Sequence, residues 1–85
     1  MEKYKISIKK SAVKELETIP KEYLSKIISR IRSLSESPRP SGSQKLSAKE
    51  QYRLRQGDYR IIYAIEDDEK TVQIVKIGHR RDVYR

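Results

Sequence analysis

The C-terminal half of this chain carries cations inside segments that otherwise have the pattern of β-strands, and the only His lies among them. Cations, an imidazole and a phenol, with few carboxylates among them, suit the binding and cleavage of a phosphodiester and suit a metal ion poorly. We therefore take these side chains as the candidate site. They are Arg53, Arg55, Arg60, His79, Arg80, Arg81, Tyr84 and Arg85.

The chemistry that such a set supports is RNA cleavage without a metal ion. The 2′-hydroxyl attacks the adjacent phosphate, and fixed guanidinium groups stabilise the negative charge that gathers on the phosphoryl oxygens. A base must take the 2′-hydroxyl proton and an acid must protonate the 5′-oxygen. His79 and Tyr84 are the candidates, because an unperturbed His titrates near pH ~6.5 and nearby Arg charges lower the pKa of a phenol. Which one is base and which is acid stays open.

Composition narrows the class of protein. The net charge is +8, from 20 Lys and Arg against 12 Asp and Glu, and this favours a polyanionic partner such as nucleic acid or an acidic protein. The 85 residues contain no Cys, so neither a disulfide nor a thiolate metal site is expected. No apolar run approaches the ~20 residues of a membrane span. We expect one domain over residues 1–85, cytoplasmic, without metal or cofactor, and with a partner protein as a further source of stability.

One strand and two helices are predicted in the N-terminal half. Apolar and polar residues alternate over residues 4–8, which predicts a strand with one wet face. Ser11 is expected to cap a first helix. Pro20 suits the first turn of a second helix, which should end near Ser37-Pro38, where a Pro- and Ser-rich loop begins. The second helix has one apolar face: Leu24, Ile27, Ile28, Ile31 and Leu34.

Three strands are predicted in the C-terminal half, over about 51–56, 59–66 and 70–77. Turn residues at 56–58 and 67–69 separate them, so consecutive strands should form hairpins. The order is then β-α-α-β-β-β. We predict an α+β fold in which an antiparallel sheet carries both N-terminal helices on one face.

The strands determine where the cations point. Arg53 and Arg55 are two residues apart, so they should share a face, which Arg60 joins across the hairpin. Tyr52 and Leu54 should point the other way, toward the helices. The remaining tyrosines considered are interpreted as packing residues: Tyr4, Tyr23, Tyr59 and Tyr63.

The chain should bend at Gly78 as it leaves the last strand. His79, Arg80 and Tyr84 are then expected to fold back over the arginine face. The acidic turn at residues 66–69 should lie at the opposite end of the sheet from Gly57, which separates negative from positive charge.

Seven segments of the chain lie at residues 11–16, 19–20, 37–40, 45–46, 52–55, 57–63 and 77–84. In their order and spacing they resemble the RelE toxins of the RelE/ParE superfamily, from bacterial and archaeal toxin–antitoxin modules. The resemblance implies a compact microbial-RNase-like fold and a cognate antitoxin that wraps the toxin. In well-studied relatives it also implies mRNA cleavage in the ribosomal A site. Any contact of this chain with operator DNA is expected only through the antitoxin complex.

The resemblance also suggests roles for single residues. Arg53 and Arg55 match a basic pair that is often Lys; because Arg is effectively always protonated, proton transfer is left to His79 and Tyr84. Tyr84 matches a tail Tyr that acts in catalysis, and His79 stands where relatives have Lys or His. We thus predict catalytic roles for Arg60, His79, Arg80 and Tyr84, and RNA phosphate binding by Arg53, Arg55, Arg81 and Arg85.

Two other functions remain open at this point. A ParE-like member of the superfamily would inhibit DNA gyrase and cut nothing. A non-catalytic basic domain would bind nucleic acid in a salt-sensitive way without strand scission. The pair His79 and Tyr84 favours the nuclease, because a gyrase inhibitor has no need of an acid–base pair.

Overall fold

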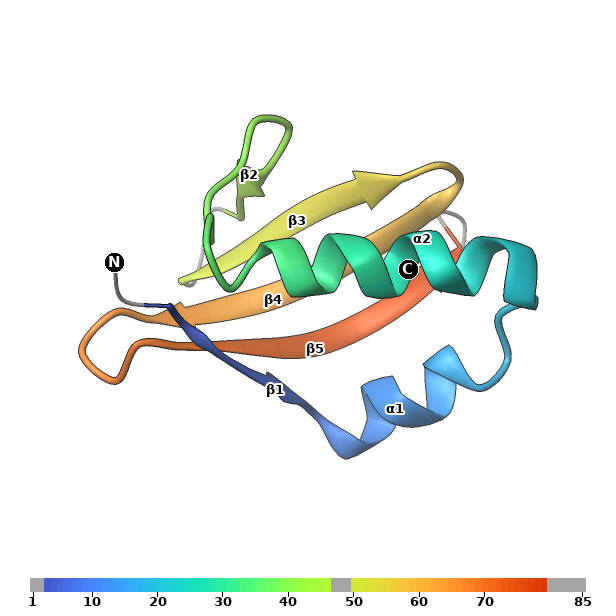
Figure 1. The fold of residues 1–85 in the computed structure, drawn as a ribbon, viewed down its shortest axis with the longest axis horizontal. Coiled ribbons are helices and arrows are strands. Elements are labelled where there is room, and N and C mark those ends of the chain that lie inside the picture. Colours follow the sequence, from blue (N-terminus) through green and yellow to red (C-terminus); the bar gives the residue numbers. More distant parts are fainter. Residues whose placement is uncertain (1–2, 47–49, 80–85) are drawn as a thin grey trace.

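The structure, a computed structural model, describes residues 3–46 and 50–79. Within them the chain forms five strands and two helices, with α2 lying across the sheet (Figure 1). This is the α+β fold that the sequence predicts. In chain order the elements are β1 (Lys5–Ile8), α1 (Lys10–Leu16), α2 (Lys21–Ser33), β2 (Gln44–Lys45), β3 (Gln51–Gln56), β4 (Tyr59–Glu66) and β5 (Thr71–His79).

The strand order is β1-β5-β4-β3-β2. The hairpins β3–β4 and β4–β5 are antiparallel, as predicted. The structure differs from the prediction in two respects: β1 lies parallel to β5, and residues 44–45 add a short strand beside β3. The parallel pairing is possible because the two helices intervene before the chain enters the sheet again, whereas a tight turn forces neighbouring strands to be antiparallel.

The hydrophobic core lies between the sheet and the helices. From α2 it takes Ile27 and Ile31, with Leu34 just beyond the helix end; Leu24 and Ile28 are half-buried at its margin. The predicted apolar face of this helix is therefore the one that packs. The sheet contributes Tyr52, Leu54, Ile61, Tyr63, Ile65, Val72, Ile74 and Ile77.

The helix ends differ from those predicted. Ser11 is not an N-cap: α1 begins at Lys10, and its N-cap residue Lys9 makes no side-chain capping bond. The second helix begins at Lys21, so Pro20 is its N-cap residue and lies just before the first turn, and its regular part ends at Ser33, before the predicted end near Ser37-Pro38. The next amides bond to carbonyls three residues back, so the chain leaves the helix through tightened turns. No helix among residues 3–46 and 50–79 is long and apolar enough to cross a membrane.

Candidate nucleic-acid interface

Three arginines share the face of the sheet that lies away from the helices. Arg55 and Arg60 are directly opposite each other in the β3–β4 register, and direct cross-strand partners point to the same side. Arg53 is two residues from Arg55 and points the same way. Tyr52 and Leu54 are buried on the helix side. The placement predicted for all five side chains is confirmed.

Protein contacts hold these arginines in place. An Arg53 guanidinium nitrogen donates a hydrogen bond to Gln44 Oε1 on the neighbouring strand. Arg55 is exposed, and its Nε donates to the Gly57 carbonyl at 3.3 Å. Arg60 is only 9% exposed and lies opposite Gly78, which adds no side chain to this face. Where water is excluded a charge interacts more strongly, so Arg60 is suited to stabilise a phosphate.

His79 lies on the other face. The strand β5 continues through Gly78 without the predicted bend, and adjacent strand residues point to opposite sides. Gly78 is therefore opposite Arg60, while His79 is opposite Tyr59, with their ring centroids 5.8 Å apart and edge to face. The prediction that His79 folds over the arginine face is wrong for this reason.

The tail residues of the predicted site lie outside the described residues. They are Arg80, Arg81, Tyr84 and Arg85. In the part of the chain that the structure describes, no cluster of three or more His, Cys, Asp or Glu side chains could hold a metal ion.

Glu15 fixes the end of β5 from which the tail begins. Among the residues that the structure describes, no strand pairs with this edge of β5 beyond β1, and Glu15 Oε1 accepts a hydrogen bond from the Ile77 amide at 2.9 Å. Glu15 Oε2 accepts a second from Lys76 Nζ at 3.2 Å. A side chain from α1 thus replaces the missing strand. Sequence reasoning missed this contact, because no local pattern relates residues 62 positions apart.

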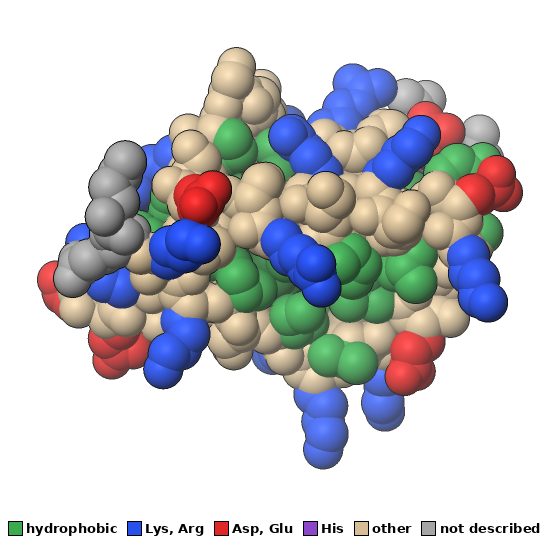
Figure 2. Space-filling view, viewed as in Figure 1, with side chains coloured by type: hydrophobic (Ala, Val, Ile, Leu, Met, Phe, Trp, Pro, Cys, Tyr) green, Lys and Arg blue, Asp and Glu red, His purple; other side chains and the backbone are tan. Residues whose placement is uncertain are grey.

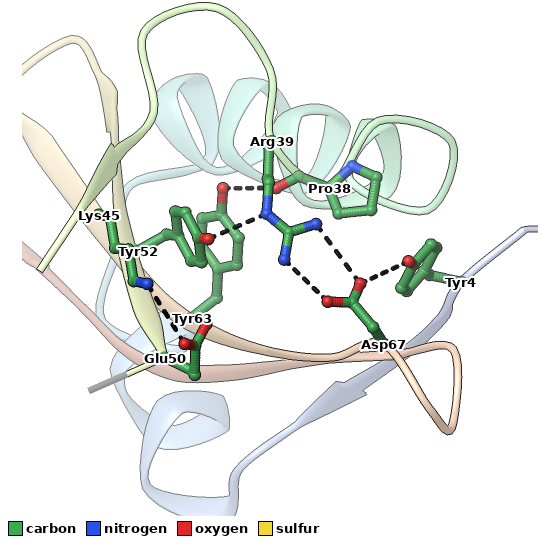
Figure 3. A network of polar contacts seen from close by, with 8 residues as sticks. All are labelled: Tyr4, Pro38, Arg39, Lys45, Glu50, Tyr52, Tyr63 and Asp67. Carbon is green, nitrogen blue, oxygen red and sulfur yellow. Dashed lines mark hydrogen bonds and ion pairs between the residues drawn. The ribbon is translucent and has the colours of Figure 1, made fainter.

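A cluster of polar contacts fastens the loop after α2 to the opposite end of the sheet (Figure 3). Arg39 donates to the Tyr52 hydroxyl at 2.9 Å and to Asp67 Oδ2 at 3.0 Å, and the Tyr4 hydroxyl donates to Asp67 Oδ1 at 2.7 Å. The hydrogen bonds from Arg39 and Tyr4 lower the pKa of Asp67, and the bond to Asp67 raises the pKa of Tyr4. Asp67 belongs to the predicted acidic turn, which does lie at the far end from Gly57 (Figure 1).

Tyr63 completes this attachment from inside the core. Its ring is fully buried and packs against Tyr52 with centroids 5.8 Å apart. Its hydroxyl donates to the Pro38 carbonyl at 2.7 Å, and burial raises the pKa of the phenol. The prediction that Tyr63 is a core residue is confirmed, whereas its hydrogen bond to a loop carbonyl could not be predicted from the sequence pattern.

Comparison with known proteins identifies the family to which the chain belongs. Residues 6–84 match the family model described as the ParE toxin of the type II toxin–antitoxin system parDE. The chain belongs to the RelE/ParE superfamily of toxins. It is 30% identical to a putative toxin RelE1 of Methanocaldococcus jannaschii over 98% of this chain and 97% of that protein.

Two further similarities support membership of the RelE type. The chain is 44% identical to toxin RelG of Mycobacterium tuberculosis over a shorter region, 40% of this chain and 39% of RelG. The crystal structure of the toxin–antitoxin complex RelBE2 from the same species contains a chain that superimposes with a TM-score of 0.81. That match has 26% identity and covers 92% of this chain and 99% of that one. The family member described here is thus a RelE-type toxin of a type II toxin–antitoxin system.

Proposed function

We propose that this toxin is an endoribonuclease that cleaves mRNA on the ribosome without a metal ion. The observation that carries the proposal is the arginine face, on which Arg53, Arg55 and the nearly buried Arg60 lie together. Three permanent cations on one face of a sheet fit the charge that a phosphodiester gains as it is cleaved.

In the proposed reaction the ribose 2′-oxygen attacks phosphorus and the bond from phosphorus to the 5′-oxygen breaks. The attacking hydroxyl loses its proton to a base, and an acid gives a proton to the departing 5′-oxygen, which leaves a 2′,3′-cyclic phosphate. Arg60 and Arg80 stabilise the charged phosphoryl oxygens, while Arg53, Arg55, Arg81 and Arg85 hold neighbouring phosphates.

Tyr84 is the stronger candidate for proton transfer. Its role rests on the resemblance to RelE toxins. His79 remains a candidate by sequence position, but its ring contacts Tyr59 on the helix side, away from Arg60. We therefore expect replacement of His79 to slow cleavage less than replacement of Tyr84.

Primer extension on mRNA in a purified translation system tests the proposal. Wild-type protein should produce discrete cuts on ribosome-bound message. Arg60→Ala should reduce the cleavage rate by about 10²–10³, the usual cost of losing one transition-state donor. Tyr84→Phe should reduce it by about 10²–10⁴, the usual contribution of general acid–base catalysis. Arg32→Ala is a matched control, because Arg32 is an exposed cation on α2. A folded wild-type protein that makes no cuts would refute the nuclease.

We further propose a cognate antitoxin as the protein partner, since the similar RelBE2 chain was crystallised in a toxin–antitoxin complex. A partner that neutralises the arginine face or displaces the tail would silence the nuclease. Charge complementarity predicts an acidic or amphipathic antitoxin segment on this surface. A complex in which the arginine face stays open and the tail undisturbed would contradict this.

Inhibition of DNA gyrase is a second candidate function, because the matching family model is described for the ParE toxin. It predicts that purified toxin inhibits gyrase supercoiling and induces the DNA-damage response on expression. Arrest of translation with intact DNA would exclude it.

A further inference from the structure

A concave site, separate from the arginine face, lies on the helix side of the sheet at the end formed by the β3–β4 turn. It is a cavity of about 420 Å³, in the size range of sites for small molecules. The second helix, the turn and the ends of β4 and β5 contribute to it, all within the described part of the chain. Its side chains include Tyr23, Lys26, Gln56, Asp58, Tyr59 and His79.

Three rings stand together at this cavity. Tyr59 contacts Tyr23 at 5.9 Å and His79 at 5.8 Å between centroids, distances at which aromatic rings attract one another. Tyr59 is half-buried against the core and holds the cluster in place. Tyr23 is 48% exposed, so much of its ring surface is open to solvent. Exposed aromatic surface of this kind serves as a stacking platform for bases of single-stranded nucleic acid.

Polar groups surround the rings. Lys26 and Asp58 are both exposed, and Gln56 is half-buried beside them. The carboxylate accepts hydrogen bonds from base amino groups, the amide both donates and accepts, and the ammonium attracts a phosphate. Across this face Lys and Arg side chains are interspersed with Asp and Glu side chains (Figure 2), and the chain as a whole has a net charge of +8, which favours a polyanionic ligand.

The cavity and the arginine face lie on either side of the turn between β3 and β4. Both border the same turn: the Gly57 carbonyl accepts the hydrogen bond of Arg55, and Gly57 lines the cavity on the other side. A Cβ atom placed on Gly57 would have no neighbouring atom within 4 Å, so the outer side of this turn is free space that a single-stranded nucleic acid could occupy. A single-stranded chain that rounds this turn would contact both faces.

We propose that this cavity binds one unpaired nucleotide of RNA, with its base stacked on Tyr23 and Tyr59 and its phosphate near Lys26. The ligand's identity as RNA rests on the proposed function; the stacking site itself rests on the geometry above. An apolar protein side chain fits less well, because it would cover Lys26 and Asp58 without giving them partners. A nucleotide provides a partner for each.

Fluorescence anisotropy with two labelled probes of equal length tests the inference on the full chain. One probe is a short 2′-O-methyl oligoadenylate, which lacks a free 2′-hydroxyl and so cannot be cleaved. The other has the same backbone without bases. Tyr23→Ala should weaken binding of the oligoadenylate by roughly 5- to 150-fold, which corresponds to ~1–3 kcal/mol for one stacked base. Its affinity for the abasic probe should not change.

Matched variants separate stacking from other effects. Tyr23→Phe keeps the ring and should bind both probes like wild type. Val13→Ala removes an exposed apolar side chain outside the cavity and should also bind like wild type. Lys26→Ala should lower the slope of log affinity against log salt by about 0.7, the value for one phosphate contact to a single strand.

The inference is overturned if Tyr23→Ala affects both probes equally or neither of them. It is also overturned if Tyr23→Ala weakens antitoxin binding and leaves RNA binding intact, because the cavity would then be a protein contact. Base-dependent binding without mRNA cleavage would support the cavity and refute the nuclease. Cleavage of mRNA without base-dependent binding would support the nuclease and overturn the proposed nucleotide site.

Discussion

Replacing Tyr63 with Phe removes one hydroxyl from the core and leaves the buried ring in place. The lost interaction is the 2.7 Å hydrogen bond to the Pro38 carbonyl. A typical hydrogen bond contributes a net ~0.5–1.5 kcal/mol, and a buried acceptor left without a partner costs about 1–3 kcal/mol. Because Pro38 is half-buried and not fully buried, the cost should lie in the lower part of that range. We therefore expect the free energy of unfolding to fall by about 1–2 kcal/mol.

Urea unfolding at pH 7, followed by circular dichroism, measures this loss. The m-value should not change, since the variant buries the same surface. In thermal unfolding the midpoint should fall by roughly 4–16 °C, at about 4–8 °C per kcal/mol for a domain of this size. Tyr23→Phe is the control, because Tyr23 is 48% exposed and its hydroxyl should contribute within about 0.5 kcal/mol.

Unfolding measured at alkaline pH tests whether the Tyr63 hydroxyl stabilises the folded protein. Burial raises the pKa of Tyr63, so the unfolded chain releases this proton at a lower pH than the folded protein. Wild type should therefore lose stability as the pH rises above about 10, and Tyr63→Phe should lack this contribution, which narrows the gap between them. A loss at pH 7 no larger than that of Tyr23→Phe would refute the reasoning, and a loss above about 4 kcal/mol would mean that the ring had moved.

Three further predictions concern other contacts. Glu15→Ala should destabilise the protein by about 1–2 kcal/mol and speed hydrogen exchange at the Ile77 amide. Glu15→Gln keeps an acceptor and should leave that exchange slow. NMR measures the exchange rate of the Ile77 amide in each variant. Because the pKa of Asp67 is lowered, its contribution is complete above about pH 4 and is lost below it, so the urea midpoint of Asp67→Asn should change less between pH 7 and pH 3 than that of wild type. Arg55→Glu should slow association with the cognate antitoxin and reduce its salt dependence in surface plasmon resonance; an unchanged association rate would place the antitoxin elsewhere.

Local patterns in the sequence determined most of the elements and their facing sides. The apolar spacing of α2 predicted the face that packs, and Gly57 between two strand patterns predicted the first hairpin. The alternation of Arg53 and Arg55 with Tyr52 and Leu54 predicted which side chains are buried. These features depend on backbone periods of 3.6 and 2 residues, which can be read without knowing what packs against them.

Tertiary structure alone decided the remaining features. The side occupied by His79 depends on whether β5 bends at Gly78 or runs through it, and the pairing with β4 keeps it extended. The parallel direction of β1 and the hydrogen bond that the Ile77 amide donates to Glu15 both depend on how distant segments meet the free edge of β5. The contact of Tyr23 with Tyr59 joins a helix to a distant strand. Each of these features arises between segments far apart in the chain, and local periodicity carries no information about such pairings.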